Sequence, residues 1–100
     1  MSTYVKSGTT VSGTVTTVTL DSWFRYVEVI NRSDDDLWVR LDGGDPAENG
    51  DNSFIIPGHS WMDINNRSTR PNLFNSTNNT TVVKLLSSSN AVDFTLSGEG

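Results

Sequence analysis

The side chain best suited to acid–base chemistry at neutral pH occurs once in this sequence, as His59 in Pro57-Gly58-His59-Ser60. A histidine acts as a general base when a nucleophile lies within hydrogen-bond reach of its ring. The chain has no cysteine and no Gly-x-Ser-x-Gly nucleophile elbow, and one histidine does not hold a zinc ion by itself. We therefore expect His59 to be an exposed turn residue, and the protein to be non-enzymatic and to bind no cofactor.

Acidic residues in two segments raise the alternative of a calcium site. Hard cations take six to eight oxygen ligands, which two converging loops can supply. The longer segment, Asp42-Gly-Gly-Asp45-Pro-Ala-Glu48-Asn-Gly-Asp51, differs from the Asp-x-Asp-x-Asp-Gly calcium loop. We favour two solvated turns in which Asp and Asn side chains bond to their own backbone, with no metal bound. The shorter of the two acidic segments is residues 34–36.

Exposed tryptophans are the third candidate feature. Trp38 and Trp61 fall on the faces opposite the aliphatic residues of their predicted strands. Such a pair could stack on sugar rings in a carbohydrate-binding module. It could equally anchor a protein interface, because aromatic residues dominate interface hot spots.

The net charge of −5 and the pI near 4.5 argue against nucleic-acid binding. The Lys and Arg residues are scattered along the chain instead of forming a basic patch. The N-terminal residues lack a long apolar run, and no stretch approaches the ~20 apolar residues of a membrane span. We expect a protein made in the cytoplasm that binds neither nucleic acid nor membrane.

Short alternating apolar runs that end at Asn, Asp, Gly or Pro predict an all-β fold. Seven or eight such strands are typical of a single-domain antiparallel β-sandwich or a small jelly-roll-like barrel. The run 23–30 has apolar residues on both faces, which predicts a central strand. The predicted strands are 14–20, 23–30, 37–41, 53–56, 60–64, 80–86 and 91–96.

The segments outside these strands complete the predicted organisation. Residues 1–13, interrupted by Ser-Gly pairs, are predicted to be an extended N-terminal arm, and 14–100 the sandwich domain. The last two runs, 80–86 and 91–96, are predicted to form a hairpin around 87–90. The long irregular stretch 65–79 has the length of a loop that is either functional or disordered, and it carries Leu73-Phe74 as an apolar anchor.

Four stretches together follow the order strand, Asn and acidic turn, strand, Asp-Gly, then an apolar strand ending in Pro-Gly, then a closing hairpin. They resemble small β-sandwich virion proteins of tailed bacteriophages, notably capsid decoration (cement) proteins, over roughly residues 24–98. The stretches are 27–43 (VEVINRSDDDLWVRLDG), 54–58 (FIIPG), 82–87 (VVKLLS) and 92–98 (VDFTLSG).

This resemblance implies a structural protein of the virion that binds the outer surface of the shell of major capsid protein and neighbouring copies of itself. A homo-trimer is compatible with a place at capsid symmetry positions. The resemblance transfers no catalytic residue. The alternatives are a carbohydrate-binding β-sandwich module and a neck or tail component. The candidate partner-binding residues are Tyr4, Val5, Leu73, Phe74, Trp38 and Trp61.

Overall fold

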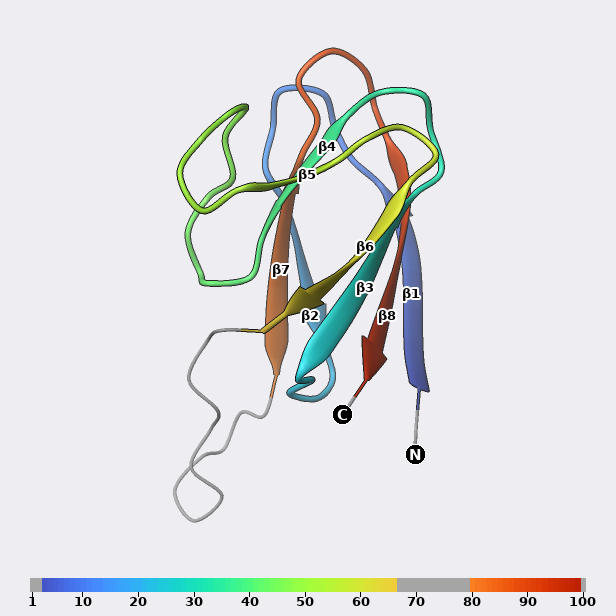
Figure 1. Cartoon of the computed structure of the whole chain (residues 1–100), viewed down its shortest axis with the longest axis vertical. Helices are drawn as coiled ribbons and strands as arrows, with labels where there is room; N and C mark the ends of the chain where they lie inside the picture. Colours follow the sequence, from blue (N-terminus) through green and yellow to red (C-terminus); the bar gives the residue numbers. More distant parts are fainter. Residues whose placement is uncertain (1–2, 67–79, 100) are drawn as a thin grey trace.

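A computed structural model describes residues 3–66 and 80–99. Within these residues the chain forms eight strands and no helix, which confirms the all-β prediction (Figure 1). In chain order the strands are β1 (Thr3–Thr9), β2 (Thr16–Leu20), β3 (Tyr26–Asn31), β4 (Leu37–Arg40), β5 (Phe54–Ile56), β6 (Trp61–Asn65), β7 (Thr81–Leu86) and β8 (Asp93–Glu99).

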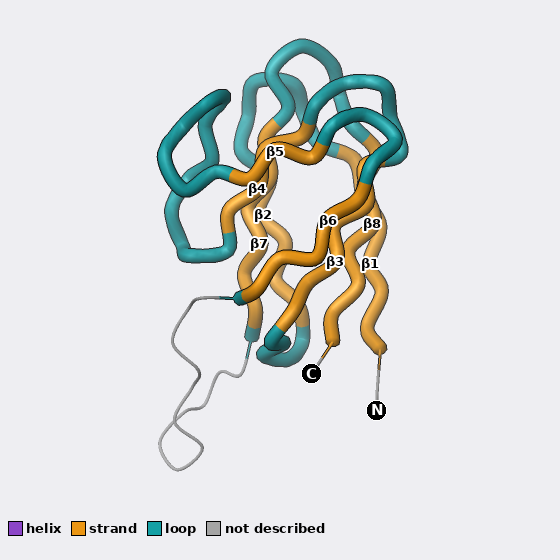
Figure 2. Tube along the Cα trace, viewed as in Figure 1, coloured by secondary structure: helices purple, strands orange, loops and turns teal. Residues whose placement is uncertain are grey.

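The strands form two antiparallel sheets of four, in the orders β1-β8-β3-β6 and β2-β7-β4-β5. The sheets face each other across the interior (Figure 2). Strand β1 pairs with β8, β2 with β7, β3 with β6 and β4 with β5. The chain is therefore one long antiparallel hairpin, with its tip between β4 and β5, rolled into two layers. This wiring is an eight-stranded jelly roll, one of the two predicted architectures.

The predicted hairpin of the last two strands is wrong. Strand β7 pairs with β2 and β4, whereas β8 pairs with β1 and β3. The connection 87–92 instead crosses between the sheets, and Ser87 and Val92 at its ends are fully buried. Thr10 holds it: its hydroxyl lies 2.6 Å from Oγ of Ser87 and accepts the backbone N–H of Val92 at 2.9 Å. A Ser/Asn-rich loop looks like a hairpin turn locally, but the two strands face each other across the core.

The predicted N-terminal arm is also corrected. Residues Thr3–Thr9 pair with β8 along their whole length, so this part of the chain is an edge strand of the sandwich. Gly8 passes close to the ring of Phe94, and a Cβ at this position would lie 2.8 Å from Cζ of that ring. Polar Ser and Thr residues hide the strand in the sequence, because an edge strand with a solvated face needs few apolar residues.

Alternating side chains from both sheets fill the core, as the binary pattern predicted. Strand β3 lies between β8 and β6, which confirms its predicted central place. Its Val27 and Val29 are fully buried. The other core residues are Val18, Leu20, Phe24, Leu37, Val39, Leu41, Ile56, Ile64, Val83, Leu85, Val92, Phe94 and Leu96.

One buried amide joins the two sheets at one end of the sandwich. Asn31, the last residue of β3, is almost fully buried. Its Nδ2 donates hydrogen bonds to the backbone oxygens of Asp35 at 2.6 Å and Ile56 at 2.9 Å. Its Oδ1 accepts the backbone N–H of Ser33 at 3.0 Å. Since Ile56 belongs to β5, this side chain fixes the acidic turn and the edge strand of the opposite sheet to β3.

Replacing this amide should destabilise the fold. Asn31→Ala removes the donor to the buried oxygen of Ile56 and to the partly buried oxygen of Asp35, so we expect the free energy of unfolding in urea to fall by about 2–3 kcal/mol. Asn90→Ala is the matched control: it removes an exposed amide bonded to Asp35 at 2.9 Å and should cost less than about 0.5 kcal/mol. Equal losses in the two variants would contradict the role assigned to Asn31.

Candidate functional site

Strands β5 and β6 are the last strands of their sheets and lie on the same side of the sandwich. The turn 57–60 joins them and is packed against the acidic turn, where the backbone N–H of His59 donates to the oxygen of Ser33 at 3.0 Å. A Cβ on Gly58 would collide with the backbone oxygen of Asp34, so this approach requires glycine. We call the surface formed by β5, β6 and the cavity between them the open side.

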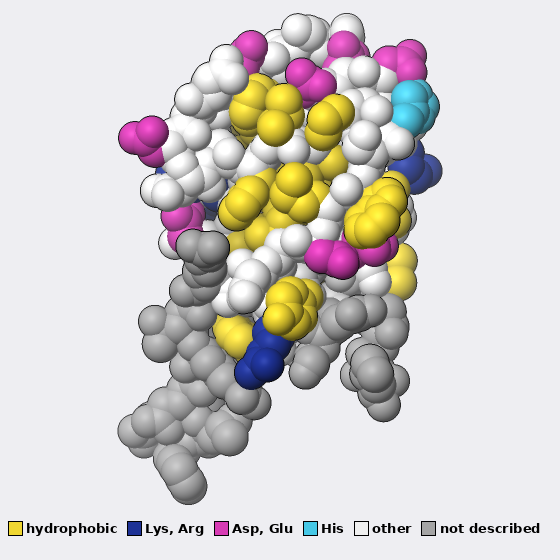
Figure 3. Space-filling model, viewed as in Figure 1, with side chains coloured by type: hydrophobic (Ala, Val, Ile, Leu, Met, Phe, Trp, Pro, Cys, Tyr) yellow, Lys and Arg dark blue, Asp and Glu magenta, His cyan; other side chains and the backbone are white. Residues whose placement is uncertain are grey.

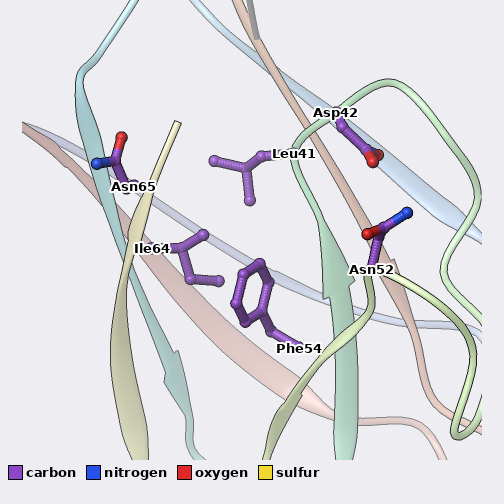
Figure 4. Close-up of a pocket in the computed structure, with 6 residues that line it drawn as sticks. All are labelled: Leu41, Asp42, Asn52, Phe54, Ile64 and Asn65. Carbon is purple, nitrogen blue, oxygen red and sulfur yellow. The ribbon is translucent and has the colours of Figure 1, made fainter. Parts of the chain in front are cut away.

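Hydrophobic side chains gather on the face that carries the open side (Figure 3). A cavity of about 170 Å³ lies there. Leu41, Phe54 and Ile64 point toward one another in it, and polar side chains surround them (Figure 4). Phe54 keeps 38% of its surface exposed although it belongs to the inward-facing set of β5. The residues that line the cavity are Leu41, Asp42, Asn52, Phe54, Ile64 and Asn65.

An ion pair anchors the loop beside this cavity. Arg40 donates from Nε to Oδ1 of Asp42 at 2.8 Å and from Nη2 to Oδ2 at 2.7 Å, and Gly44 donates its backbone N–H to Oδ1 at 3.1 Å. The hydrogen bond from Arg40 holds the pKa of Asp42 below its ordinary value near 3.8. The same bond raises the pKa of Arg40. Asp42 is thus an ionised acceptor at neutral pH.

Two carboxylates of the acidic loop that we considered as a calcium site form ion pairs with basic side chains. Asp45 lies 3.1 Å from Nζ of Lys84, and Asp42 is held by Arg40. Among the described residues, no three His, Cys, Asp or Glu side chains come together as metal ligands. His59 lies in an exposed turn with a positive φ of 57°, and its ring is next to the carboxylate of Asp34. Its predicted place as an exposed turn residue is confirmed.

The outer face of β6 brings two carboxylates together. Asp63 is directly opposite Glu28 of β3, so both side chains stand on the same face. The hydrogen bonds Asn31 N to Ser60 O and Asn66 N to Arg25 O, both 2.8 Å, fix the alternation of the ladder. In that alternation Glu28 and Asp63 form a non-hydrogen-bonded pair, the type whose side chains approach most closely. Neither carboxylate has an ion pair with a described residue.

Aromatic side chains flank this acidic pair. Trp61 is opposite Ile30, one row along the sheet, and exposes 63% of its surface. Tyr26 is opposite Asn65 in the row on the other side and is also exposed. On the outer face of the β3–β6 pair, the acidic row therefore lies between two rows that each carry an exposed aromatic side chain.

The structure separates the candidate partner-binding residues. Trp61 is exposed as predicted, but Trp38 is only 7% exposed, so a sugar platform built on both is wrong. Trp38 lies on the outer face of an interior strand, between its cross-strand neighbours Ile55 and Leu86, and these account for its burial. Leu73 and Phe74 lie outside the described residues.

The two N-terminal candidates lie on β1, the edge strand at the other side of the sheet. Val5 exposes 60% of its surface, and the backbone of Tyr4 pairs with Gly98. They are therefore separated from Trp61 by the width of the sheet.

The sequence reasoning did not single out Phe54, Asn52, Asn65, Glu28 or Asp63. For the last two, the alternation within each predicted strand gave the face, but only the strand pairing shows that they are opposite.

Comparison with protein-family models, with curated proteins and with solved structures finds no match to this chain. No helix in the described residues is long and apolar enough to cross a membrane.

The like-charge pair on β6 should cost stability. Asp63→Asn removes the repulsion with Glu28, so we expect the free energy of unfolding to rise by about 0.2–1 kcal/mol at low salt. The gain should shrink in high salt, because screening weakens the repulsion between exposed charges. Asp21→Asn, at an exposed turn position, is the control and should leave stability unchanged. A loss of stability in Asp63→Asn would contradict the pairing.

The Arg40–Asp42 pair predicts a pH dependence. Because the folded pKa of Asp42 is lowered, its stabilisation is present above its ordinary pKa and is lost as the pH falls through the folded pKa. Between about pH 5 and pH 2, wild type should therefore lose more stability than Asp42→Asn in urea titrations. Asp21→Asn should follow the wild-type curve. Parallel curves for wild type and Asp42→Asn would show that this pair contributes nothing.

Proposed function

We propose that this chain is a non-enzymatic structural protein of a tailed-phage virion, a capsid decoration (cement) protein that binds the outer surface of the major capsid protein shell. The observation that carries the proposal is the open side of the jelly roll. There, two edge strands, exposed apolar residues and a cavity lie together. The sequence resemblance to small β-sandwich virion proteins supports the same role.

Open sheet edges favour binding to another protein. An edge strand presents backbone N–H and C=O groups that can pair with a further strand, and soluble β proteins commonly cover or charge such edges. Here the β5 edge exposes Phe54 and Ile55 and carries no charged residue, and the β6 edge exposes Trp61 beside Asp63. Aromatic anchors beside a hollow are the usual core of a protein interface.

The rest of the molecule supplies the rigidity that such a role needs. Two packed sheets form a stiff body that can bridge neighbouring shell subunits, and many copies on a closed lattice add avidity to a weak single contact. Val5 lies on β1, at the opposite edge of the sheet from β6, and offers a contact for a neighbouring copy, including one within a homo-trimer. The net charge of −5 disfavours adhesion to nucleic acid.

A carbohydrate-binding module is the second candidate, and the cavity is the observation that favours it. Phe54 offers a ring face for stacking on a sugar, while Asp42, Asn52 and Asn65 offer hydrogen-bonding groups at its rim. A glycan array separates the two functions. Specific binding of one glycan that is lost in Phe54→Ala would favour this candidate over shell binding.

Truncating the anchors of the open side should weaken binding to particles. In sedimentation of purified protein with particles stripped of it, we expect Trp61→Ala and Phe54→Ala each to lower the affinity roughly tenfold or more. Val11→Ala is the matched control, since Val11 is as exposed as Trp61 but lies between β1 and β2. If both open-side variants bound fully while Val11→Ala lost binding, this surface would be rejected. No binding of wild type would reject the function.

A further inference from the structure

We propose that the β6 edge accepts an extended segment of a partner protein by strand addition, with an arginine or lysine of that segment opposite Asp63. The inference rests on the proposed function, because it specifies the partner chemistry of the open side. It makes a distinct claim about geometry: the partner forms a further strand of the β1-β8-β3-β6 sheet. Strand addition at an exposed sheet edge is a common mode of peptide recognition.

The hydrogen-bond alternation identifies the backbone groups that are free for this pairing. The bonds Asn31 N to Ser60 O and Asn66 N to Arg25 O place every second residue of the β6 ladder in a hydrogen-bonded pair with β3. Met62 and Ile64 therefore bond to β3. The N–H and C=O groups of the intervening residues point to the outer edge, where no described strand pairs with them. These residues are Trp61, Asp63 and Asn65.

The side chains of the same residues determine what the segment must carry. Asp63 stands on the outer face beside Glu28, and an added residue opposite Asp63 points to that face too. A basic side chain there faces two carboxylates that have no described cation partner, and it relieves their repulsion. The exposed ring of Trp61, two residues along β6, adds a surface for a cation–π contact.

The neighbours of that basic residue in the segment should be apolar. Side chains alternate between the faces of a strand, so the residues before and after it point inward. On the inner face of β6 lies the cavity of the open side, which Phe54 and Ile64 line. The fitting segment therefore alternates apolar, basic and apolar residues.

A second copy of this chain does not provide such a segment at either free edge of the sheet. In a symmetric antiparallel pairing of two β6 strands centred on Asp63, the carboxylates of two copies would meet. The β1 residues whose side chains stand on the outer face of the sheet include Val5, Ser7 and Thr9, none of which is basic. Lys6 of β1 lies on the other face, opposite Leu96. The charge pattern favours a different, basic partner.

The test uses a blocked peptide, Thr-Val-Arg-Val-Thr, and its matched control, Thr-Val-Glu-Val-Thr, titrated into isotope-labelled full-length protein. We expect the arginine peptide to bind roughly tenfold more tightly, with slower amide hydrogen exchange at Trp61, Asp63 and Asn65. Asp63→Lys should reverse the preference, and Asp21→Lys should leave it unchanged. Equal binding of the two peptides, no binding, or slowed exchange elsewhere would overturn the proposal. Slowed exchange at this edge without peptide, appearing as the protein concentration rises, would identify a second copy as its occupant and overturn it too.

Binding to stripped particles separates this inference from the proposed function. We expect Asp63→Lys to bind particles at least about tenfold more weakly than wild type and Asp21→Lys to bind normally. If wild type binds and Asp63→Lys binds equally well, the basic segment is wrong and shell binding remains. If wild type does not bind while the peptide result holds, the shell is not the partner and the strand-addition site remains.

Discussion

The geometry of the open side depends on the buried amide of Asn31. This side chain ties the end of β3 to β5 of the opposite sheet and to the acidic turn between β3 and β4. The turn 57–60 packs on the same acidic turn and leads directly into β6. This buried polar contact thus ties the end of β5 and, through the turn 57–60, the start of β6 to the end of β3. Buried amides with all their partners satisfied are well suited to such a task, because losing any partner is costly.

The jelly-roll topology explains the position of the open side. Pairing the strands as one long hairpin leaves β5 and β6 at the end of their sheets, on the same side, although β5 belongs to one layer and β6 to the other. The core is therefore covered on its two faces by sheets but only by loops and half-exposed side chains at this side. Phe54 shows the consequence, since an inward-facing residue at an edge remains partly in solvent. Fold alone does not assign function, and jelly rolls serve both viral shells and lectins.

Much of the fold follows from the sequence, and the errors have physical causes. Alternation in β4 and β6 gave their inward faces correctly, because burial of one face imposes a period of two. The apolar residues on both faces of the 23–30 run gave the central place of β3 but not its inward face. Strand β1 was missed because Ser, Thr and Gly on an edge carry no such pattern. Trp38 was placed on the correct face but wrongly expected to be exposed, since burial on an outer face depends on its neighbours in other strands, Ile55 and Leu86. The Glu28–Asp63 pair and the cavity likewise arise from strand pairing, which no single segment reveals.

We propose that this chain is a component of a virus particle, held there by its open side. The decisive experiment is quantitative mass spectrometry of gradient-purified particles from the producing culture. We expect the chain to travel with the particles at close to one copy per major shell subunit. A few copies per particle would place it at the neck or tail instead of the shell. Complete absence from the particles would contradict a place in the virion.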